Sequence, residues 1–394
     1  MVNATPLFTS LRDVLIPGSN VTPVLTLSKV ILLLPNPLLF SINENQFATT
    51  NSKRYQRVSS TLVILLHLAV TLKWRLGQWV YPDNQSPIST WKLVYIYYCI
   101  TLYVAVLIFI GHLAFLKEET IALLNSAMQM EREVNAKETK TVHIFYVGFV
   151  AIFKIGIFIM PIFGFVFAMV RPCMPPILTS MLVSECSKSW RDEGDIGILF
   201  RIFSAILLAW LSATIVTIVD FVIPLVLIYP TVVKLIILEK MLSDWFSGWR
   251  ITSSYLITYR TVQILSAMHN SVMRQPIMQT LLGGVIVCES CTLYILITSS
   301  SVAPVPVLVL LGTVAIQMFM VIVGPFKMMA KPFVKSVKIL KIFQEMNVSR
   351  WAKRFVRSCP PSKMTLGDGK FFDRATSLVI WTKSVDLLIT FLLM

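Results

Sequence analysis

The stretch Leu93–Phe115 reads LVYIYYCITLYVAVLIFIGHLAF and contains no Asp, Glu, Lys or Arg. A helix of about 20 apolar residues crosses roughly 30 Å of hydrocarbon, so this stretch predicts a transmembrane helix. The rest of the chain agrees, because 56% of its 394 residues are hydrophobic and only 14% are charged. Ordinary soluble proteins have about 25% charged residues. The sequence therefore predicts an all-α, polytopic membrane protein.

Further stretches of the chain are also long and apolar enough to cross the bilayer. The seven predicted spans are Val58–Val80, Leu93–Phe115, Val142–Val170, Ile198–Ile228, Leu281–Thr298, Val302–Pro325 and Ala375–Met394. The apolar stretch Val30–Phe40 is short and is interrupted by Pro35 and Pro37, which favours an interfacial or re-entrant helix over an eighth span. The spans divide the chain into an N-terminal segment 1–57, a six-helix bundle 58–326, a basic segment 327–370 and a terminal helix 371–394.

The distribution of lysine and arginine predicts the orientation, because these residues are retained on the cytoplasmic side. The N-terminal segment and the loops after the second, fourth and sixth spans share one side, and this side holds most of them, including the run from Lys327 to Lys370. We therefore predict a cytoplasmic N-terminus and an extracellular C-terminus, the reverse of a G-protein-coupled receptor. The chain has a net charge of +15, and much of it lies beside the spans, where attraction to anionic membrane lipid accounts for it. We therefore do not expect nucleic acid as a partner.

The sequence has no pattern typical of an enzyme or a metal site. It lacks a glycine-rich phosphate loop, and its four histidines are far apart. Cys288 and Cys291 have CxxC spacing, but no second pair completes a zinc site, so we interpret them as small residues in helix packing. We expect neither enzymatic activity nor a cofactor.

Two modifications are predicted on the outer side. Asn84 is the one of four Asn-x-Ser/Thr sequons that falls there, which makes it the expected glycosylation site. Cys173 and Cys186 share the loop between the third and fourth spans. Because the extracellular compartment permits disulfides, we hypothesise a Cys173–Cys186 bridge, with two unpaired thiols as the alternative.

The basic segment has the pattern of an amphipathic helix. Its lysines recur every three or four residues, at Lys327, Lys331, Lys335 and Lys338. The predicted apolar face consists of Val334, Val337, Leu340, Ile342 and Phe343. Such a helix either lies on the inner leaflet with its lysines reaching the headgroups, or packs against copies of itself as an assembly domain. The sequence leaves both interpretations open.

The last predicted span carries a stripe of polar residues at helical spacing. Intramembrane polar residues are costly in lipid and normally face protein or water, so the stripe either packs within the bundle, with Lys383 and Asp386 as an ion pair, or borders a pore. One helix cannot enclose a pore, but copies around a symmetry axis can. The predicted pore-lining residues are Thr376, Ile380, Lys383, Asp386, Leu387 and Thr390.

The stretch RSCPPSKMTLGDGKFFDRATSLV, from Arg357 to Val379, resembles the C-terminal signature of arthropod odorant and gustatory receptors. The matching residues are Ser358, Cys359, Lys363, Gly367 or Gly369, Phe371, Phe372, Arg374, Thr376 and Leu378. The Thr-Tyr and Gln-Phe pairs that gustatory receptors often carry in their last helix are absent here, so both branches of the family stay open.

The resemblance implies a ligand-gated, non-selective cation channel in the plasma membrane of a sensory neuron. It would be a homotetramer, or a heterotetramer with an odorant co-receptor, and its last helix would line the pore. The resemblance also implies a small ligand in the outer half of the bundle. There this chain has the aromatic residues Trp91, Tyr95, Tyr98, Phe163, Phe167, Phe203 and Trp210.

A secondary transporter is the alternative function. In a transporter, intramembrane charged residues would couple the substrate to ions. The candidates for this role are Arg201, Asp220, Glu289 and Lys383.

Overall fold

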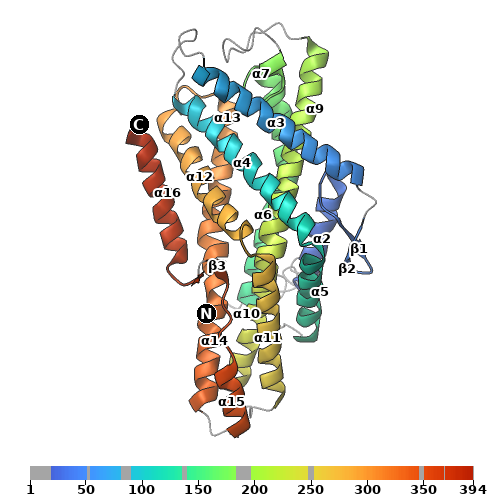
Figure 1. The fold of residues 1–394 in the computed structure, drawn as a ribbon, viewed down its shortest axis with the longest axis vertical. Coiled ribbons are helices and arrows are strands. Elements are labelled where there is room, and N and C mark those ends of the chain that lie inside the picture. The colour runs from blue at the N-terminus through green and yellow to red at the C-terminus, as the bar shows by residue number, and fades with distance from the viewer. Residues whose placement is uncertain are drawn as a thin grey trace, which may run out of the picture.

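The computed structural model describes residues 19–50, 54–80, 90–134, 140–182, 197–246, 253–345, 350–367 and 369–393. These residues form an elongated helical bundle with two short hairpins (Figure 1). Seven helices among them are long and apolar enough to cross a membrane, as predicted. They are α3 (Arg54–Val80), α4 (Thr90–Phe115), α6 (Lys140–Val170), α9 (Ile198–Asp220) with its continuation to Trp245, α12 (Ile277–Thr298), α13 (Val305–Val321) with its continuation to Glu345, and α16 (Thr376–Leu393).

Two of these helices continue well beyond Ile228 and Pro325, where the predicted spans end, and the limits of the membrane-spanning parts remain predictions. The continuations are η2 (Phe221–Ile228) and α10 (Tyr229–Phe246) after α9, and η3 (Ile322–Phe326) and α14 (Lys327–Glu345) after α13. Both η segments are π-helical and contain a proline, Pro224 or Pro325. Proline interrupts the α-helical hydrogen-bond ladder, and the wider π-turn lets the helix continue past it.

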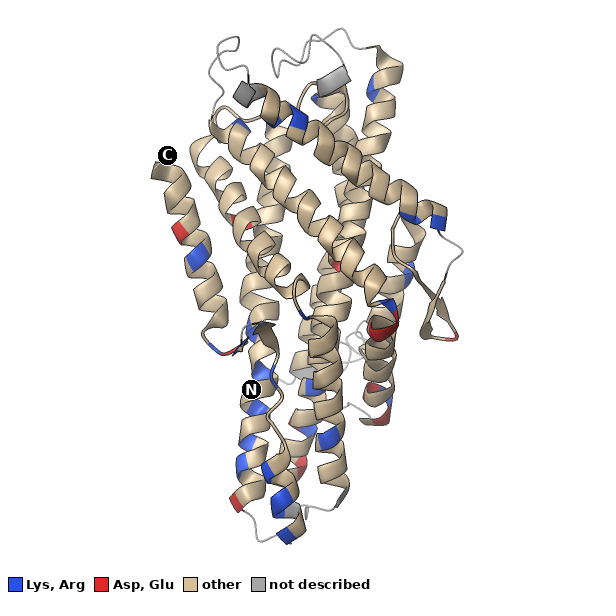
Figure 2. Cartoon of the chain, viewed as in Figure 1, with Lys and Arg blue, Asp and Glu red and all other residues tan. Residues whose placement is uncertain are grey.

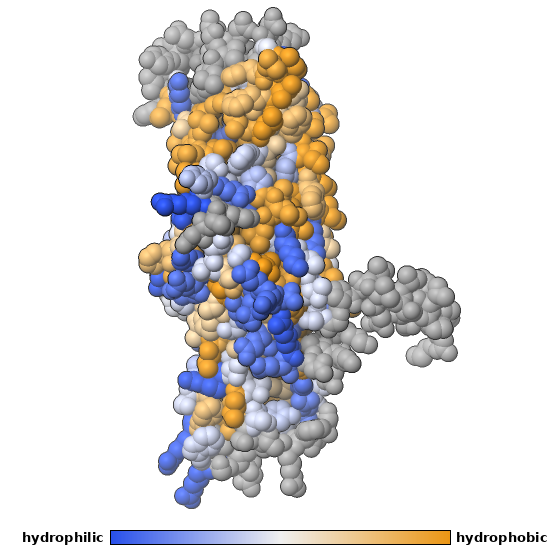
Figure 3. Space-filling model, turned by 90° about the vertical axis from the view of Figure 1, so that its right-hand side faces the viewer, coloured by the Kyte–Doolittle hydropathy of each residue, from blue (hydrophilic) through white to orange (hydrophobic). Residues whose placement is uncertain are grey.

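The continuations form the lower half of the molecule together with shorter helices. These are α5 (Lys117–Val134), α11 (Ser253–Val272) and α15 (Arg350–Ser358). Lys and Arg residues gather in this half (Figure 2), and apolar side chains cover much of the upper part of the face shown in Figure 3. This division agrees with the expected membrane-spanning and cytoplasmic parts of the chain. The orientation of the termini remains a prediction.

The basic segment begins as the predicted helix, α14. It runs on in the direction of α13 (Figure 1) and packs against α10, where Lys335 forms an ion pair with Glu239. Part of the segment is therefore packed against another helix of the same chain, and both interpretations of its role remain open. Its apolar face differs from the predicted one, because Val337 is exposed whereas Ile339 is buried. The helical spacing of the buried Ser336, Ile339 and Phe343 turns position 337 outward.

The N-terminal apolar helix lies earlier than predicted. It is α2 (Val21–Leu33), which ends within the stretch Val30–Phe40, and the rest of that stretch is not helical. Pro35 and Pro37 prevent the helix from continuing. The buried Asn36 closes its end, because its Nδ2 donates hydrogen bonds to the carbonyl oxygens of Ile31 (3.0 Å) and Leu34 (2.8 Å).

A hairpin of β1 (Phe40–Asn43) and β2 (Gln46–Thr49) follows α2. Its two loop residues, Glu44 and Asn45, both have positive φ, as the tight turn of a two-residue hairpin requires. Asn125 on α5 holds the hairpin against the bundle. It accepts a hydrogen bond from the Phe47 N–H and donates one to the Phe47 carbonyl, both at 2.9 Å.

Replacing Asn125 should loosen this hairpin. Asn125→Ala removes both hydrogen bonds to Phe47, and we expect it to lower the free energy of unfolding by about 2 kcal/mol. The matched control is Gln129→Ala, because Gln129 lies on the same helix and bonds only the exposed Glu133. Its effect should stay within about 0.5 kcal/mol. Thermal unfolding of the purified protein in detergent measures both, and equal effects would contradict a role of Asn125 in holding the hairpin.

Candidate ligand cavity and terminal helix

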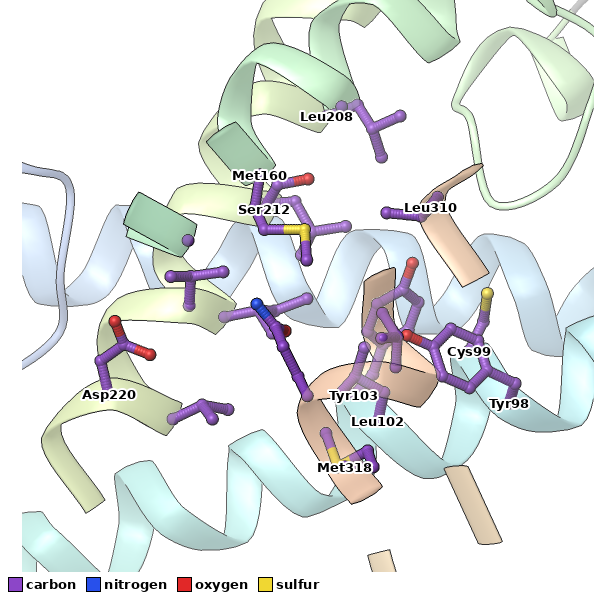
Figure 4. Close-up of a pocket in the computed structure, with 18 of the residues that line it drawn as sticks. Tyr98, Cys99, Leu102, Tyr103, Met160, Leu208, Ser212, Asp220, Leu310 and Met318 are labelled. Carbon is purple, nitrogen blue, oxygen red and sulfur yellow. The ribbon is translucent and has the colours of Figure 1, made fainter. Parts of the chain in front are cut away.

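A cavity lies among α4, α6, α9 and α13 (Figure 4). Its empty volume is about 1100 Å³, which includes space open to the surroundings. Most of the wall is apolar, with Met160, Leu208, Leu310 and Met318 among its side chains. The position and lining of this cavity make it the candidate ligand site of the chain.

The α4 wall of the cavity is a stripe of aromatic and thiol side chains. Tyr95, Tyr98, Cys99 and Tyr103 recur at three- and four-residue spacing, and all four are buried. The rings of Tyr95 and Tyr98 stack with their centroids 6.2 Å apart. This stripe gives the cavity flat aromatic faces and hydroxyl groups on one side.

The opposite wall depends on the close approach of α6 and α9 at Gly164. A β-carbon at Gly164 would lie 2.5 Å from Ser212 Oγ and 3.1 Å from the carbonyl oxygen of Leu208. Both distances are shorter than ordinary van der Waals contact, so a larger residue at this point would require Ser212 and the α9 backbone to shift. The crossing of these two helices therefore sets the width of the cavity beside Ser212.

A few polar groups interrupt the apolar lining, namely Ser212, Gln317 and Asp220. Asp220 is only 3% exposed. Within the part of the chain that the structure describes, its Oδ2 has no hydrogen-bond partner. Figure 4 shows Asp220 on one side of the cavity and Tyr98, Cys99 and Tyr103 on the other. No Lys, Arg or His is among the described residues that line this space.

Three of the seven aromatic residues expected at the ligand site line this cavity: Tyr95, Tyr98 and Phe167. The other four lie outside the described lining of this cavity, and their role in ligand binding remains a prediction. Trp91 is buried elsewhere on α4, Phe163 is half-buried, and Phe203 is 52% exposed. The Trp210 Nε1–H donates to Ser60 Oγ on α3, at 3.2 Å. Aromatic content alone did not tell which face of each helix turns inward.

Sequence reasoning missed several residues of the wall, including Tyr103, Phe153 and Gln317. For two of them a signal was available. Tyr103 continues the helical spacing that begins at Tyr95, and Phe153 lies at helical spacing from Gly156 on the inner face of α6. Nothing in the sequence around Gln317 marks it as a cavity residue.

The terminal helix α16 lies at the edge of the bundle and packs mainly against α12 (Figure 1). The Ser290 hydroxyl on α12 donates to the carbonyl oxygen of Ser384, at 2.8 Å. Two edge-to-face aromatic pairs flank this contact: Tyr294 with Phe391, and Phe319 with Trp381. Ser290 belongs to the CESC motif, whose Cys288 and Cys291 are buried. The motif thus serves helix packing, as interpreted from the sequence.

The predicted pore-lining stripe is divided between two faces of α16. Thr376 and Ile380 are buried against the rest of the same chain, together with Ser384 and Leu388. Their role in lining a pore remains a prediction. Lys383, Asp386 and Thr390 are exposed, and Leu387 is half-buried at the boundary.

The predicted ion pair within α16 is present. Lys383 Nζ lies 3.4 Å from Asp386 Oδ2, and the two side chains are 65% and 55% exposed. The pair therefore faces away from its own subunit and is not buried in the bundle. A charged pair on the outer face of a membrane-spanning helix is costly if lipid surrounds it.

The four charged residues considered for a transporter lie in separate places. Asp220 lines the cavity. Glu289 is buried on α12, Lys383 is exposed on α16, and Arg201 is half-buried near the start of α9. The structure does not gather them into one coupling site.

The two predicted modifications involve residues outside the described part of the chain. Asn84 and Cys186 both lie there, and Cys173 is buried. Glycosylation at Asn84 and the Cys173–Cys186 disulfide remain predictions.

A second hairpin leads into α16. It consists of β3 (Thr365–Gly367) and β4 (Lys370–Phe371). Asp373 then caps the helix, because its Oδ1 accepts hydrogen bonds from the Thr376 hydroxyl (2.6 Å) and the Ala375 N–H (3.1 Å). The hydrogen bond from Thr376 lowers the pKa of the Asp373 carboxyl. The ionised carboxylate therefore stabilises the start of α16.

The cavity wall at Gly164 can be tested with a small substitution. Gly164→Ala should force α6 and α9 apart and lower the free energy of unfolding by about 1 to 3 kcal/mol. The matched control is Gly148→Ala on the same helix, where a β-carbon would meet nothing within 4 Å. That variant should be neutral or stabilising, because alanine favours helix. A thermal melt in which both variants behave alike would contradict the close approach at Gly164.

The cap at Asp373 should make the stability of α16 depend on pH. Asp373→Ala should cost about 1 kcal/mol at neutral pH, as the loss of a helix cap does. Because the folded-state pKa lies below the unfolded value, the wild-type advantage should be complete above about pH 4 and disappear below it. Thermal midpoints of wild type and variant across this range measure the effect. Arg374→Ala, at the exposed neighbouring position, should show no such pH dependence.

Comparison with solved structures identifies a protein with a similar fold. The insect olfactory receptor OR5 from Machilis hrabei in complex with eugenol aligns over 94% of this chain and 97% of its own, with a TM-score of 0.61 and 14% identity. A second structure of that receptor aligns over 93% and 96%, with a TM-score of 0.49 and 11% identity, and the fold is assigned from the first alone. No protein-family model matches the sequence, and no curated protein is similar to it at the sequence level. The chain therefore has the seven-helix membrane fold of the insect olfactory receptors.

Proposed function

We propose that this chain is a chemosensory receptor, odorant or gustatory, that acts as a ligand-gated, non-selective cation channel in the plasma membrane of a sensory neuron. The observation that carries the proposal is the tyrosine-lined cavity enclosed by four membrane-spanning helices of this fold. A mostly apolar cavity with a few polar groups suits a small organic ligand. The structural neighbour is itself a receptor in complex with a small molecule, eugenol.

The outer face of α16 supports the channel part of the proposal. In a single subunit, Lys383, Asp386 and Thr390 are exposed on a helix that is otherwise apolar enough to span the membrane. Lipid is a poor environment for these side chains, whereas water or a neighbouring subunit satisfies them. Four copies around a closed symmetry axis would place α16 beside a central aqueous path. The proposed assembly is a homotetramer, or a heterotetramer with an odorant co-receptor.

Within such a pore, the exposed residues of α16 would have different roles. The Thr390 hydroxyl can replace part of the water around a passing cation. Asp386 compensates the charge of Lys383 at 3.4 Å, so the pair presents little net positive charge to cations. Leu387, at the edge of the exposed face, can contribute to an apolar ring that closes the pore by dewetting.

One helix connects the cavity to the terminal helix. α12 packs against α4, which supplies Tyr95, Tyr98 and Tyr103 to the cavity wall, and also against α16. A ligand that moves α4 would shift α12, and the hydrogen bond from Ser290 to the Ser384 carbonyl transmits that shift to α16. We infer that gating uses this route, in which packed helices have two discrete arrangements.

Electrical recording tests the proposed function directly. We expect whole-cell cation currents in cells that express the chain, alone or with an odorant co-receptor, when small volatile compounds are applied. The transporter alternative predicts proton-coupled uptake without channel-sized currents. That result would overturn the channel proposal.

Cysteine substitutions test the orientation of α16. Cysteines at Lys383 and Thr390 should react with small aqueous thiol reagents in conducting channels and change the current, because these positions are exposed. Cysteines at Ser384 and Leu388 are the controls and should react much more slowly, because both are buried against the same chain. Equal reaction rates at all four positions would contradict a pore bordered by the exposed face.

A further inference from the structure

The carboxyl group of Asp220 is the feature of the cavity that a simple apolar ligand does not explain. Its side chain is 3% exposed, and its Oδ2 has no hydrogen-bond partner among the described residues. It lies at the end of α9, a membrane-spanning helix, and the π-helical segment η2 begins at the next residue. Buried carboxyl groups normally have partners, because an isolated one is costly in an apolar environment. π-Helical segments are frequent at functional sites.

The described residues around Asp220 do not supply a partner for its Oδ2, so a ligand is the candidate partner. No basic side chain lines the cavity within the described part of the chain, so the described lining offers no cation there. The described salt bridges involve other acidic residues, namely Glu239, Glu345 and Asp386. A bound cation would satisfy the carboxylate by a charge-assisted hydrogen bond, which is stronger than a neutral one. A bound anion would be repelled.

The rest of the lining suits the other parts of an organic cation. The rings of Tyr98 and Tyr103 face the cavity opposite Asp220 (Figure 4), and aromatic faces attract cations. Ser212 and Gln317 add oxygen acceptors for further N–H groups. The wall follows α9 from Leu208 to Asp220, about 18 Å at the rise of an α-helix. This length accommodates a polar head at Asp220 and an apolar body beside Met160.

We propose that the cavity binds small organic amines, with the protonated nitrogen paired to Asp220 and the apolar body held by the tyrosine and methionine side chains. This inference rests on the proposed function, since it names the ligand class of the same cavity. Its consequence is a preference based on charge. An amine should bind better than the alcohol of the same size and shape, because the alcohol leaves Asp220 without an ionic partner.

Matched pairs of ligands test the preference on the whole protein. The pairs are 2-phenylethylamine with 2-phenylethanol, and hexylamine with 1-hexanol, applied at neutral pH where both amines are protonated. For wild type, we expect at least a tenfold lower half-maximal concentration for the amine of each pair, both in evoked current and in the ligand-induced rise of the thermal midpoint of purified protein.

Two neutralising substitutions then locate the preference. Asp220→Asn keeps the size of the side chain and removes its charge, so the amine should lose its tenfold advantage while the alcohol changes little. The matched control is Glu289→Gln, because Glu289 is equally buried in a spanning helix, also has a carboxylate oxygen without a described partner, and lies outside the described cavity lining. That variant should keep the preference for amines. The thermal midpoint without ligand shows whether each variant folds.

The outcomes separate this inference from the proposed function. Currents evoked equally by amine and alcohol in wild type, or the same loss of preference in both variants, would overturn the amine inference and leave the receptor function standing. A thermal shift by amines without any current would support the amine site and contradict the channel. If neither amine of the panel shifts the midpoint or evokes a current, the inference is wrong; if no compound of any class does so, the proposed receptor function fails with it.

Discussion

Backbone hydrogen bonding inside hydrocarbon is the constraint on which this structure depends. Each N–H and C=O at membrane depth must find a partner within the chain, which restricts the spans to continuous helices. Pro224 and Pro325 would break two of them. At both prolines the helix continues through a π-helical segment. At the end of the first of these segments, the Tyr229 N–H donates a hydrogen bond to the Pro224 carbonyl, five residues earlier. The same carbonyl accepts a hydrogen bond from the Tyr146 hydroxyl. Because these helices continue, α10 and α14 extend the bundle beyond α9 and α13.

The second determinant is the position of α12 between the cavity and the terminal helix. Its small residues let it pack closely: Gly284 faces Ala105 of α4, where a β-carbon would meet the Ala105 side chain at 3.9 Å. On the other side, Ser290 reaches the backbone of α16. A movement of α4 at the cavity wall can therefore reach α16, the helix that borders the proposed ion path, through α12 alone.

Three acidic residues within the spans have different environments, and these environments separate their roles. Asp220 lies in the cavity without a described partner for its Oδ2, Glu289 is buried beside the α12–α16 packing, and Asp386 pairs with Lys383 at the outer face. Desolvation penalises Asp220 and Glu289 as isolated charges, whereas Asp386 has its counter-ion, Lys383, on the same helix. The sequence marks all three as costly in lipid, and helix spacing supplies the partner of Asp386, whereas the tertiary packing decides the surroundings of Asp220 and Glu289.

The sequence by itself determined the seven spans and their approximate limits, because hydrocarbon length and backbone satisfaction act locally along the chain. It also placed Lys383 and Asp386 at a spacing that allows an ion pair, which the structure contains, although on an exposed face and not buried in the bundle. Only the tertiary structure decided which faces turn inward. Tyr103 lines the cavity whereas Phe203 faces outward, and Ile380 packs inside its own subunit although Thr390, on the same predicted stripe, is exposed. The reason is physical: in spans that are apolar on every side, hydrophobic periodicity is too weak to set rotation, so side-chain packing between helices sets it.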